Sequence, residues 1–293
     1  MSEEDLPETV TLLKGPHQNT VYLIGTAHFS EESERDVIQT IQKVKPDVIV
    51  LELCASRRHV LSMDKETLLK EASELTIAKI RMIIKSNGTV PGLLHIVLLW
   101  LSAHITKQLG MAPGGEFRAA VVAANELENE CRIILGDRPI NITISRALAA
   151  LNWWQRLKLL ISAVTSSREG ISKEEVERCK KSDVLDDLLL EAAKSMPQFT
   201  HVLLNERDEY LSTSIAKASS IANGSIVAVV GIGHVKGIVK NWLKYDDCSH
   251  LLSIPTRESS LLSKTLKWTL YLSSIAAVIF TVKRVVNGKK IFN

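Results

Sequence analysis

Four short runs rich in Val, Ile and Leu limit what this 293-residue chain can fold into. Each run ends at a glycine or an ionisable residue, and helical patterns separate the runs. They are NTVYLIGTAH (19–28), PDVIVLEL (46–53), CRIILGDR (131–138) and GSIVAVVGIGH (224–234). Runs that are apolar on both faces are typical of buried strands in parallel sheets. The sequence therefore predicts an α/β domain with a mainly parallel central sheet flanked by helices.

The clearest helix between these runs covers residues 30–44. It opens with a Ser-x-x-Ser cap region and an acidic first turn, and it stops before Pro46. Val37, Ile41 and Val44 lie on one face at helical spacing. Residues 116–130 and 205–222 follow the same pattern.

The ends of the predicted strands carry reactive side chains. The first and last runs each close with a G-x-x-H motif, which ends at His28 in the first run and at His234 in the last. The second and third runs deliver Glu52 and Asp137. Ligands in such sheets collect at the carboxyl ends of the strands, so these four residues are expected to converge. Two imidazoles and two carboxylates at one edge suit a divalent metal or acid/base chemistry.

Other interpretations of the strand ends stay open. Glu52 and Asp137 can instead form ion pairs with arginines that follow them in sequence, namely Arg57, Arg58 and Arg138. Residues 231–237 have the spacing G-x-G-x-x-x-G without the acidic residue that a dinucleotide loop needs. Cys54 is either a thiol nucleophile or a small buried hydrophobe, and the second role is the commoner one for cysteine.

The distribution of charge and cysteine excludes several classes of protein. Seven basic residues and one acidic residue follow position 256, so the positive excess lies in the C-terminal segment and argues against a nucleic-acid binder. The four cysteines are far apart and contain no C-x-x-C pair, which favours a reducing compartment. An acidic N-terminus without an apolar run predicts no secretory signal and a cytosolic main domain.

The C-terminal segment has the pattern of a membrane anchor. Residues 268–282 contain no charge and are bracketed by basic residues, with Trp268 and Tyr271 suited to headgroup depth. A span of about 17 residues is reached if Lys267 extends its ammonium to the interface. Such a short span favours the mitochondrial outer membrane, with the endoplasmic reticulum as the alternative. A buried terminal helix is the competing interpretation.

Taken in order, these motifs resemble the TraB/PrgY/GumN family, and most closely its eukaryotic TraB-domain members. The matching segments are VYLIGTAHFS (21–30), VIVLELCASR (48–57), PGGEFRAA (113–120), ILGDRPINITISRA (134–147), NERDEYL (205–211) and VVGIGHVKGI (229–238). The resemblance implies a fold like those of the erythromycin-esterase-like and ChaN-like proteins, related to the Tiki-type metalloproteases.

The predicted division of the chain follows from these segments. It comprises an acidic N-terminal segment (1–19), a TraB-like α/β domain (20–250) with a helical insert at about 60–112, a linker (251–265), a membrane anchor (266–284) and a basic tail (285–293).

The resemblance also implies an active centre of His28, Glu52 and His234. The histidines and a carboxylate would hold Mn, Co, Zn or Fe, with Glu52 as a ligand or general base. Arg138 or Arg207 would stabilise an oxyanion or grip a substrate carboxylate. The residues expected to line or brace the cleft are Arg57, Glu116, Asp137, Arg146 and Glu206.

Two functions are predicted on this basis. The first is a membrane-anchored, metal-dependent hydrolase of a peptide or protein substrate, because bacterial members are associated with inhibiting peptide pheromones and Tiki relatives with cleaving secreted proteins. The chain departs from the Tiki pattern by placing its domain in the cytosol. The alternative is a non-catalytic scaffold or contact-site adaptor that recruits cytosolic protein partners and regulates organelle dynamics.

Overall fold

The computed structural model of the chain describes residues 6–27, 30–61, 82, 85–86, 114–156, 158 and 196–255. The chain divides into two compact units, Met1–Ile254 and Pro255–Asn293, and all the elements below belong to the first. The predicted anchor at 266–284 and most of the predicted insert at 60–112 lie outside the described residues. Within the described ranges, no helix is long and apolar enough to cross a bilayer.

Five strands form one sheet in the order β1-β2-β5-β3-β4. They are β1 (Val10–Lys14), β2 (Thr20–Thr26), β3 (Val48–Leu51), β4 (Arg132–Leu135) and β5 (Ile226–Gly231). β1 pairs antiparallel with β2, and the other neighbours run parallel. The mainly parallel sheet and its four predicted strands are therefore confirmed. β1 is an additional edge strand, and β4 is an edge strand that is only partly buried.

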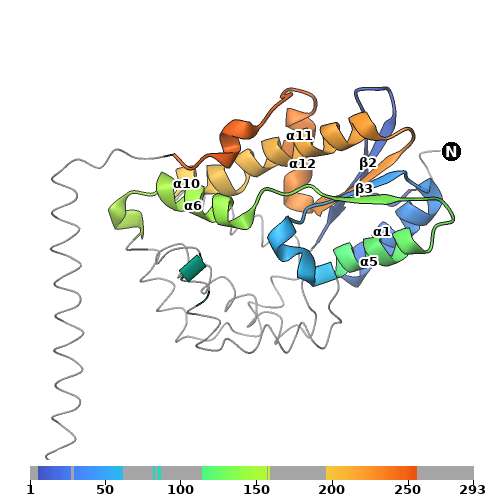
Figure 1. The fold of residues 1–293 in the computed structure, drawn as a ribbon, viewed down its shortest axis with the longest axis horizontal. Coiled ribbons are helices and arrows are strands. Elements are labelled where there is room, and N and C mark those ends of the chain that lie inside the picture. The colour runs from blue at the N-terminus through green and yellow to red at the C-terminus, as the bar shows by residue number, and fades with distance from the viewer. Residues whose placement is uncertain are drawn as a thin grey trace, which may run out of the picture. The chain divides into compact units, whose positions relative to one another are not determined.

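Helices cover both faces of the sheet (Figure 1). One face packs against α1 (Glu31–Val44) and α5 (Gly115–Asn125), and the other packs against α11 (Asn205–Ile221) and α12 (Ile232–Asn241). Successive β3 residues alternate between the two faces, with Ile49 and Leu51 toward α1 and α5 and Val48 and Val50 toward α11. This double burial explains why the strands read as continuous apolar runs.

Helix α1 follows the sequence prediction closely. The Oγ of Ser30 caps it by accepting the N–H of Ser33 at 3.2 Å, and the acidic first turn complements the helix dipole. It ends at Lys45, whose φ of 45° is left-handed. The predicted helix 116–130 is shorter than expected and ends at Asn125, because the stretch that follows is polar apart from Leu127, which alone packs against the core.

Four further helical elements complete the described fold. They are η2 (Ala55–Leu61), α6 (Ile140–Ala150), α10 (Pro197–Leu203) and η3 (Ser249–Leu252). Trp153 and Trp154 follow α6 and stack with ring centroids 3.8 Å apart. Both side chains are exposed.

Candidate functional site

Five ionisable side chains meet at the carboxyl ends of β3, β4 and β5. Glu52 directly follows β3, Asp137 lies just beyond β4, and His234 lies in the first turn of α12, which follows β5. Arg207 and Asp208 come from the first turn of α11. We call these five residues the strand-end cluster. Glu52, Asp137, Arg207 and His234 were all predicted from the sequence to belong to the site.

Glu52 is buried and fixed by three groups. Its Oε2 accepts the backbone N–H of Gly231 at 2.7 Å, and its Oε1 accepts Nη2 of Arg207 at 2.5 Å. The same Oε1 lies 3.4 Å from Nε2 of His234. The carboxylate therefore faces the imidazole of the second G-x-x-H motif. Its arginine partner lies 155 positions away in the sequence.

Asp137 links Arg207 to a second arginine. Its Oδ1 accepts Nε of Arg207 at 3.2 Å, and its Oδ2 accepts Nη2 of Arg207 at 3.0 Å and Nη2 of Arg57 at 2.8 Å. The backbone N–H of Arg138 also donates to Oδ1. The Nε of Arg57 is buried and has no hydrogen-bond partner among the described residues. Arg57 therefore has a donor at the site that its contact with Asp137 does not use.

Arg207 lies at the centre of the strand-end cluster. Burial alone would lower the pKa of its guanidinium, but the charges of Asp137 and Glu52 outweigh burial and raise the pKa above the ordinary value for arginine. The group is thus a permanent cation that joins two buried carboxylates.

His234 is held between Asp208 and Arg207. Its Nδ1 lies 2.6 Å from Oδ1 of Asp208, and its Nε2 lies 3.0 Å from Nη1 of Arg207. A guanidinium can only donate, so Nε2 is the acceptor and Nδ1 carries the proton that Asp208 accepts. The hydrogen-bond pattern thus directs Nδ1 toward Asp208 and Nε2 toward Glu52 and Arg207.

The contact between α11 and α12 depends on Gly237. A Cβ at this position would overlap Oδ2 of Asp208, so the glycine lets Asp208 reach His234 from the neighbouring helix. Gly233, one turn earlier in α12, has no heavy atom within 4 Å of a Cβ built on it. The two glycines thus form a matched pair in one helix.

We expect opposite effects from alanine at these two positions. Gly237→Ala should lower the free energy of unfolding by about 1–3 kcal/mol, because the methyl group displaces Asp208. Gly233→Ala should raise it by about 0.5–1 kcal/mol, because alanine restricts the unfolded chain and fits the helix. Urea denaturation of both variants measures these changes. Equal effects at the two positions would contradict the close approach of Asp208 to α12.

The first G-x-x-H motif adjoins the second, although His28 lies outside the described residues. A Cβ built on Gly25 would come within 2.8 Å of Cγ2 of Val235 and 3.4 Å of the backbone of Ile232. The end of β2 therefore packs closely on the start of α12. Gly231 has an extended backbone, with φ of −61° and ψ of 140°, which residues other than glycine also adopt.

The described part of the strand-end cluster does not fit a divalent metal in this arrangement. The Nε2 of His234 and both oxygens of Glu52 already contact Arg207 or a backbone N–H. A metal ion between them would lie beside a guanidinium, whose positive charge opposes it. Among the described residues, no group of three or more His, Cys, Asp or Glu side chains is placed to hold a metal.

Three predicted site residues form a separate buried cluster, which we call the Glu206 cluster. Glu206 accepts Nη1 of Arg138 at 2.7 Å and both Nε and Nη2 of Arg146, at 2.7 and 2.8 Å. The side chain of Arg138 is 0% exposed and also donates to Thr143 and to the carbonyl oxygens of Val202 and Leu251. The structure therefore places the guanidinium predicted to be catalytic in a buried network.

The Glu206 cluster also holds the end of the described chain. Arg146 donates to the carbonyl oxygens of His250, within the short helix η3, and of Ser253, which directly follows it. Burial raises the pKa of Glu206, but the hydrogen bonds and charges of Arg146 and Arg138 outweigh burial and lower it. Glu206, Arg207 and Asp208 are consecutive residues of α11. Glu206 belongs to the Glu206 cluster, and Arg207 and Asp208 belong to the strand-end cluster.

Glu116 and Cys54 occupy other buried positions. Glu116 lies in the first turn of α5. Nearby, burial lowers the pKa of Arg118, and the opposing charges of Glu34 and Glu116 do not fully offset this effect. Burial raises the pKa of the Cys54 thiol, but contacts with Ser56, Arg57 and the backbone of Ile140 outweigh burial and lower it. The Sγ of Cys54 lies 3.2 Å from Oγ of Ser56.

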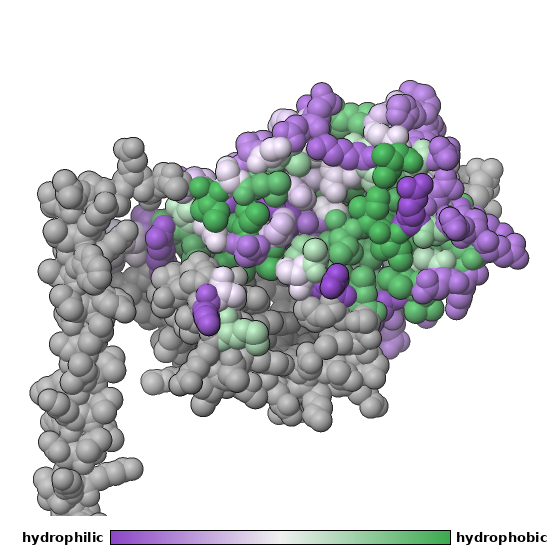
Figure 2. Space-filling view, in the orientation of Figure 1, coloured by the Kyte–Doolittle hydropathy of each residue, from purple (hydrophilic) through white to green (hydrophobic). Residues whose placement is uncertain are grey.

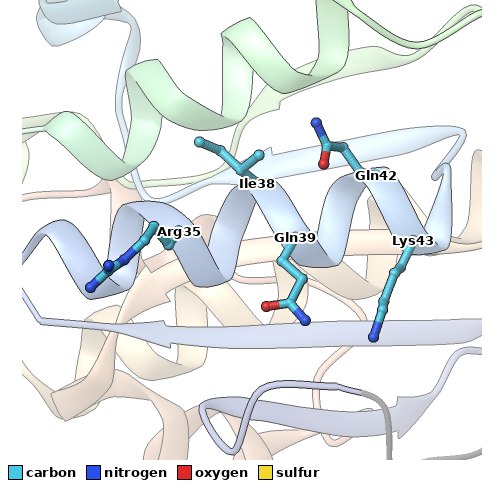
Figure 3. A pocket seen from close by; sticks show the side chains of 5 residues that line it. All are labelled: Arg35, Ile38, Gln39, Gln42 and Lys43. Atoms are coloured by element: carbon cyan, nitrogen blue, oxygen red, sulfur yellow. The ribbon is translucent and has the colours of Figure 1, made fainter.

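A surface depression elsewhere is unrelated to these clusters. Its five lining residues, Arg35, Ile38, Gln39, Gln42 and Lys43, all belong to α1. Figure 3 shows Gln39 and Lys43 pointing to one side of the helix and Ile38 and Gln42 to the other. Such a single-helix surface offers no convergent polar groups, so we assign it no ligand.

Asp208 is the functional candidate that sequence reasoning missed. Its partner His234 lies on a different helix, 26 positions away, and no local motif joins them. The available signal was Gly237, which lies one helical turn after His234. A glycine at that spacing in a helix indicates close approach by another group.

Comparison with known proteins gives a consistent result over most of the chain. Residues 10–244 match the TraB/PrgY/gumN family. Proteins named TraB domain-containing protein from Mus musculus and Homo sapiens are each 42% identical over 86% of this chain and 70% of their own length. An uncharacterized protein of Methanocaldococcus jannaschii is 26% identical over 96% of this chain and 69% of its own length.

Proposed function

The chain belongs to the TraB/PrgY/gumN family, and from that premise we propose that it is a hydrolase that cleaves a peptide or ester bond at the strand-end cluster. The observation that carries the proposal is the buried pair of Asp208 and His234, whose Nδ1 to Oδ1 distance is 2.6 Å. A carboxylate in this position fixes one tautomer of the imidazole and leaves Nε2 as the base.

In the proposed reaction, Nε2 of His234 removes a proton from a water molecule. The oxygen of that water attacks the substrate carbonyl carbon, and the imidazolium then returns the proton to the leaving amine or alcohol. Arg207 shifts its donor from Nε2 to the developing oxyanion, while Glu52 and Asp137 keep the guanidinium in place. The side chain of Arg57 is 35% exposed, so its guanidinium is suited to binding a substrate carbonyl or carboxylate beside Asp137.

This route uses no metal, in contrast to the sequence prediction of a metal held by His28, His234 and Glu52. Metal ligation stays a prediction, and elemental analysis of the purified full chain tests it. Stoichiometric Mn, Co, Zn or Fe that disappears in the His28→Ala/His234→Ala variant would replace the metal-free route with the metal-dependent one.

The hydrolase proposal is tested with the full chain and a panel of fluorogenic peptides and nitrophenyl esters. We expect His234→Gln to lower kcat/KM by about 100-fold or more, because the general base is lost. His201→Gln, at an exposed position of α10, is the matched control and should keep full activity. Far-ultraviolet circular dichroism confirms that both variants fold. Hydrolysis that survives in folded His234→Gln would reject the mechanism.

A second candidate function is the non-catalytic adaptor at the mitochondrial outer membrane or the endoplasmic reticulum, with cytosolic protein partners. It is favoured by the strand-end cluster itself, since Arg207 pairs with Glu52, Asp137 and His234 as a structural brace would. Absence of hydrolysis across the panel, with and without added metal, together with normal organelle shape in cells carrying His234→Gln, would favour the adaptor.

A further inference from the structure

Helix α12 presents an unusual outer surface. Ile232 is 46% exposed and Val239 is 41% exposed, and beyond the helix Leu243 and Tyr245 are 48% and 42% exposed. Lys236, Lys240 and Lys244 are also exposed. We call these seven residues the lysine face. The described residues form no ion pair with its three lysines.

The part of the lysine face within α12 is one side of an amphipathic helix. At about 100° per residue, Ile232, Lys236 and Val239 lie within about 60° of one another around the helix axis. His234 and Ile238 lie on the opposite side and are buried. The helix thus has one face that serves the strand-end cluster and another that is largely exposed, although Ile232 also lies against Gly25 at the end of β2.

The segment after α12 keeps an apolar side chain exposed at an unfavourable backbone position. Leu243 has a φ of 54°, a left-handed conformation in which glycine or asparagine is usual. The preceding residue is fixed, because Nε1 of Trp242 donates to the carbonyl oxygen of Lys14 at 2.7 Å. An exposed leucine on such a backbone indicates that its side chain is used at the surface.

We propose that the lysine face lies on an anionic phospholipid bilayer. Apolar side chains interleaved with lysines are typical of helices that lie in a membrane interface, where the lysines meet acidic headgroups. The lysine face has only seven residues, and its helical part, about 15 Å long and about 10 Å wide, covers about 150 Å². A stable protein interface needs about 800 Å² per partner, so the lysine face is too small to hold a protein by itself. The inference goes beyond the proposed hydrolysis and does not depend on it.

Site-specific photo-crosslinking of the full chain tests this proposal. Leu243 is replaced by p-benzoylphenylalanine, and a second protein carries the same residue in place of Ile221, an exposed position at the end of α11. Each is irradiated with vesicles of phosphatidylcholine containing phosphatidylserine, and with vesicles of phosphatidylcholine alone. Because both proteins have the same C-terminal segment, the comparison isolates the lysine face from any membrane anchor.

We expect lipid adducts at position 243 to exceed those at position 221 by about tenfold or more in the anionic vesicles. The excess should disappear in neutral vesicles and in the Lys236→Glu/Lys240→Glu/Lys244→Glu variant. If that variant unfolds, the comparison of lipid adducts at positions 243 and 221 in the two kinds of vesicle still tests the proposal. Equal lipid adducts at both positions, or crosslinks from position 243 mainly to a second protein chain, would overturn the proposal.

Discussion

The Arg207→Met variant is expected to lose about 3–5 kcal/mol of its free energy of unfolding. Methionine fills a similar space but removes the cation that joins Glu52 and Asp137 at 2.5 and 3.0 Å. Both carboxylates are buried, and among its described partners Glu52 would keep the N–H of Gly231 and the nearby imidazole. Leaving buried charge uncompensated is one of the few changes that costs this much. Urea denaturation at neutral pH measures the loss.

Two comparisons identify the cause of that loss. Arg58→Met alters an exposed arginine of the same segment, and it should change stability by less than about 0.5 kcal/mol. Adding Glu52→Gln to Arg207→Met removes the charge of Glu52, whereas Asp137 keeps its ion pair with Arg57, so the double variant should recover part of the stability. A double variant no more stable than Arg207→Met would indicate that lost packing, and not charge, causes the loss.

The Glu206→Gln variant should lose about 3 kcal/mol, because Arg138 and Arg146 would then share no counter-ion. Arg138 is fully buried and cannot turn to solvent. The loss should come with earlier proteolytic cleavage near residues 250–253, since Glu206 orients the arginines that hold those carbonyl oxygens. Limited proteolysis and urea denaturation of the full chain measure both effects.

The effect of Glu206 should also depend on pH in a defined direction. The folded state lowers the pKa of Glu206, so its stabilising contribution is complete above the ordinary pKa of 4.5 and is lost as the pH falls through the lowered folded value. The difference in stability between wild type and Glu206→Gln should therefore be constant near neutral pH and shrink in acid. A difference that grows on acidification would contradict this assignment.

The sheet was predictable because its central strands are buried on both faces. β2, β3 and β5 contact helices above and below, so alternation is absent and the runs of Val, Ile and Leu stand out. β1 has no such run, since VTLLK is an edge strand that is only partly buried. Its pairing depends on β2 as a neighbour, and this is not encoded in its own five residues.

The residues of the candidate site could be predicted from their positions at the ends of strands, but their ion-pair partners could be predicted less well. The rule that strand ends converge brought Glu52, Asp137 and His234 together, whereas neighbours in sequence were poor guides to ion pairs. Arg57 pairs with Asp137, and Glu52 pairs with Arg207 from α11. Arg138 directly follows Asp137, but its guanidinium lies in the Glu206 cluster. The direction in which a long side chain leaves a turn depends on tertiary packing, and no sequence motif specifies that packing.

The consecutive placement of Glu206, Arg207 and Asp208 limits how this protein can change during evolution. Successive residues of a helix project about 100° apart, so each of the three reaches its own partners only in one register of α11. A single-residue insertion or deletion that rotates the start of α11 would misplace all three at once. Substitutions can be compensated one at a time, but length changes between α10 and α11 cannot. Length variation among relatives should therefore be rare at this junction.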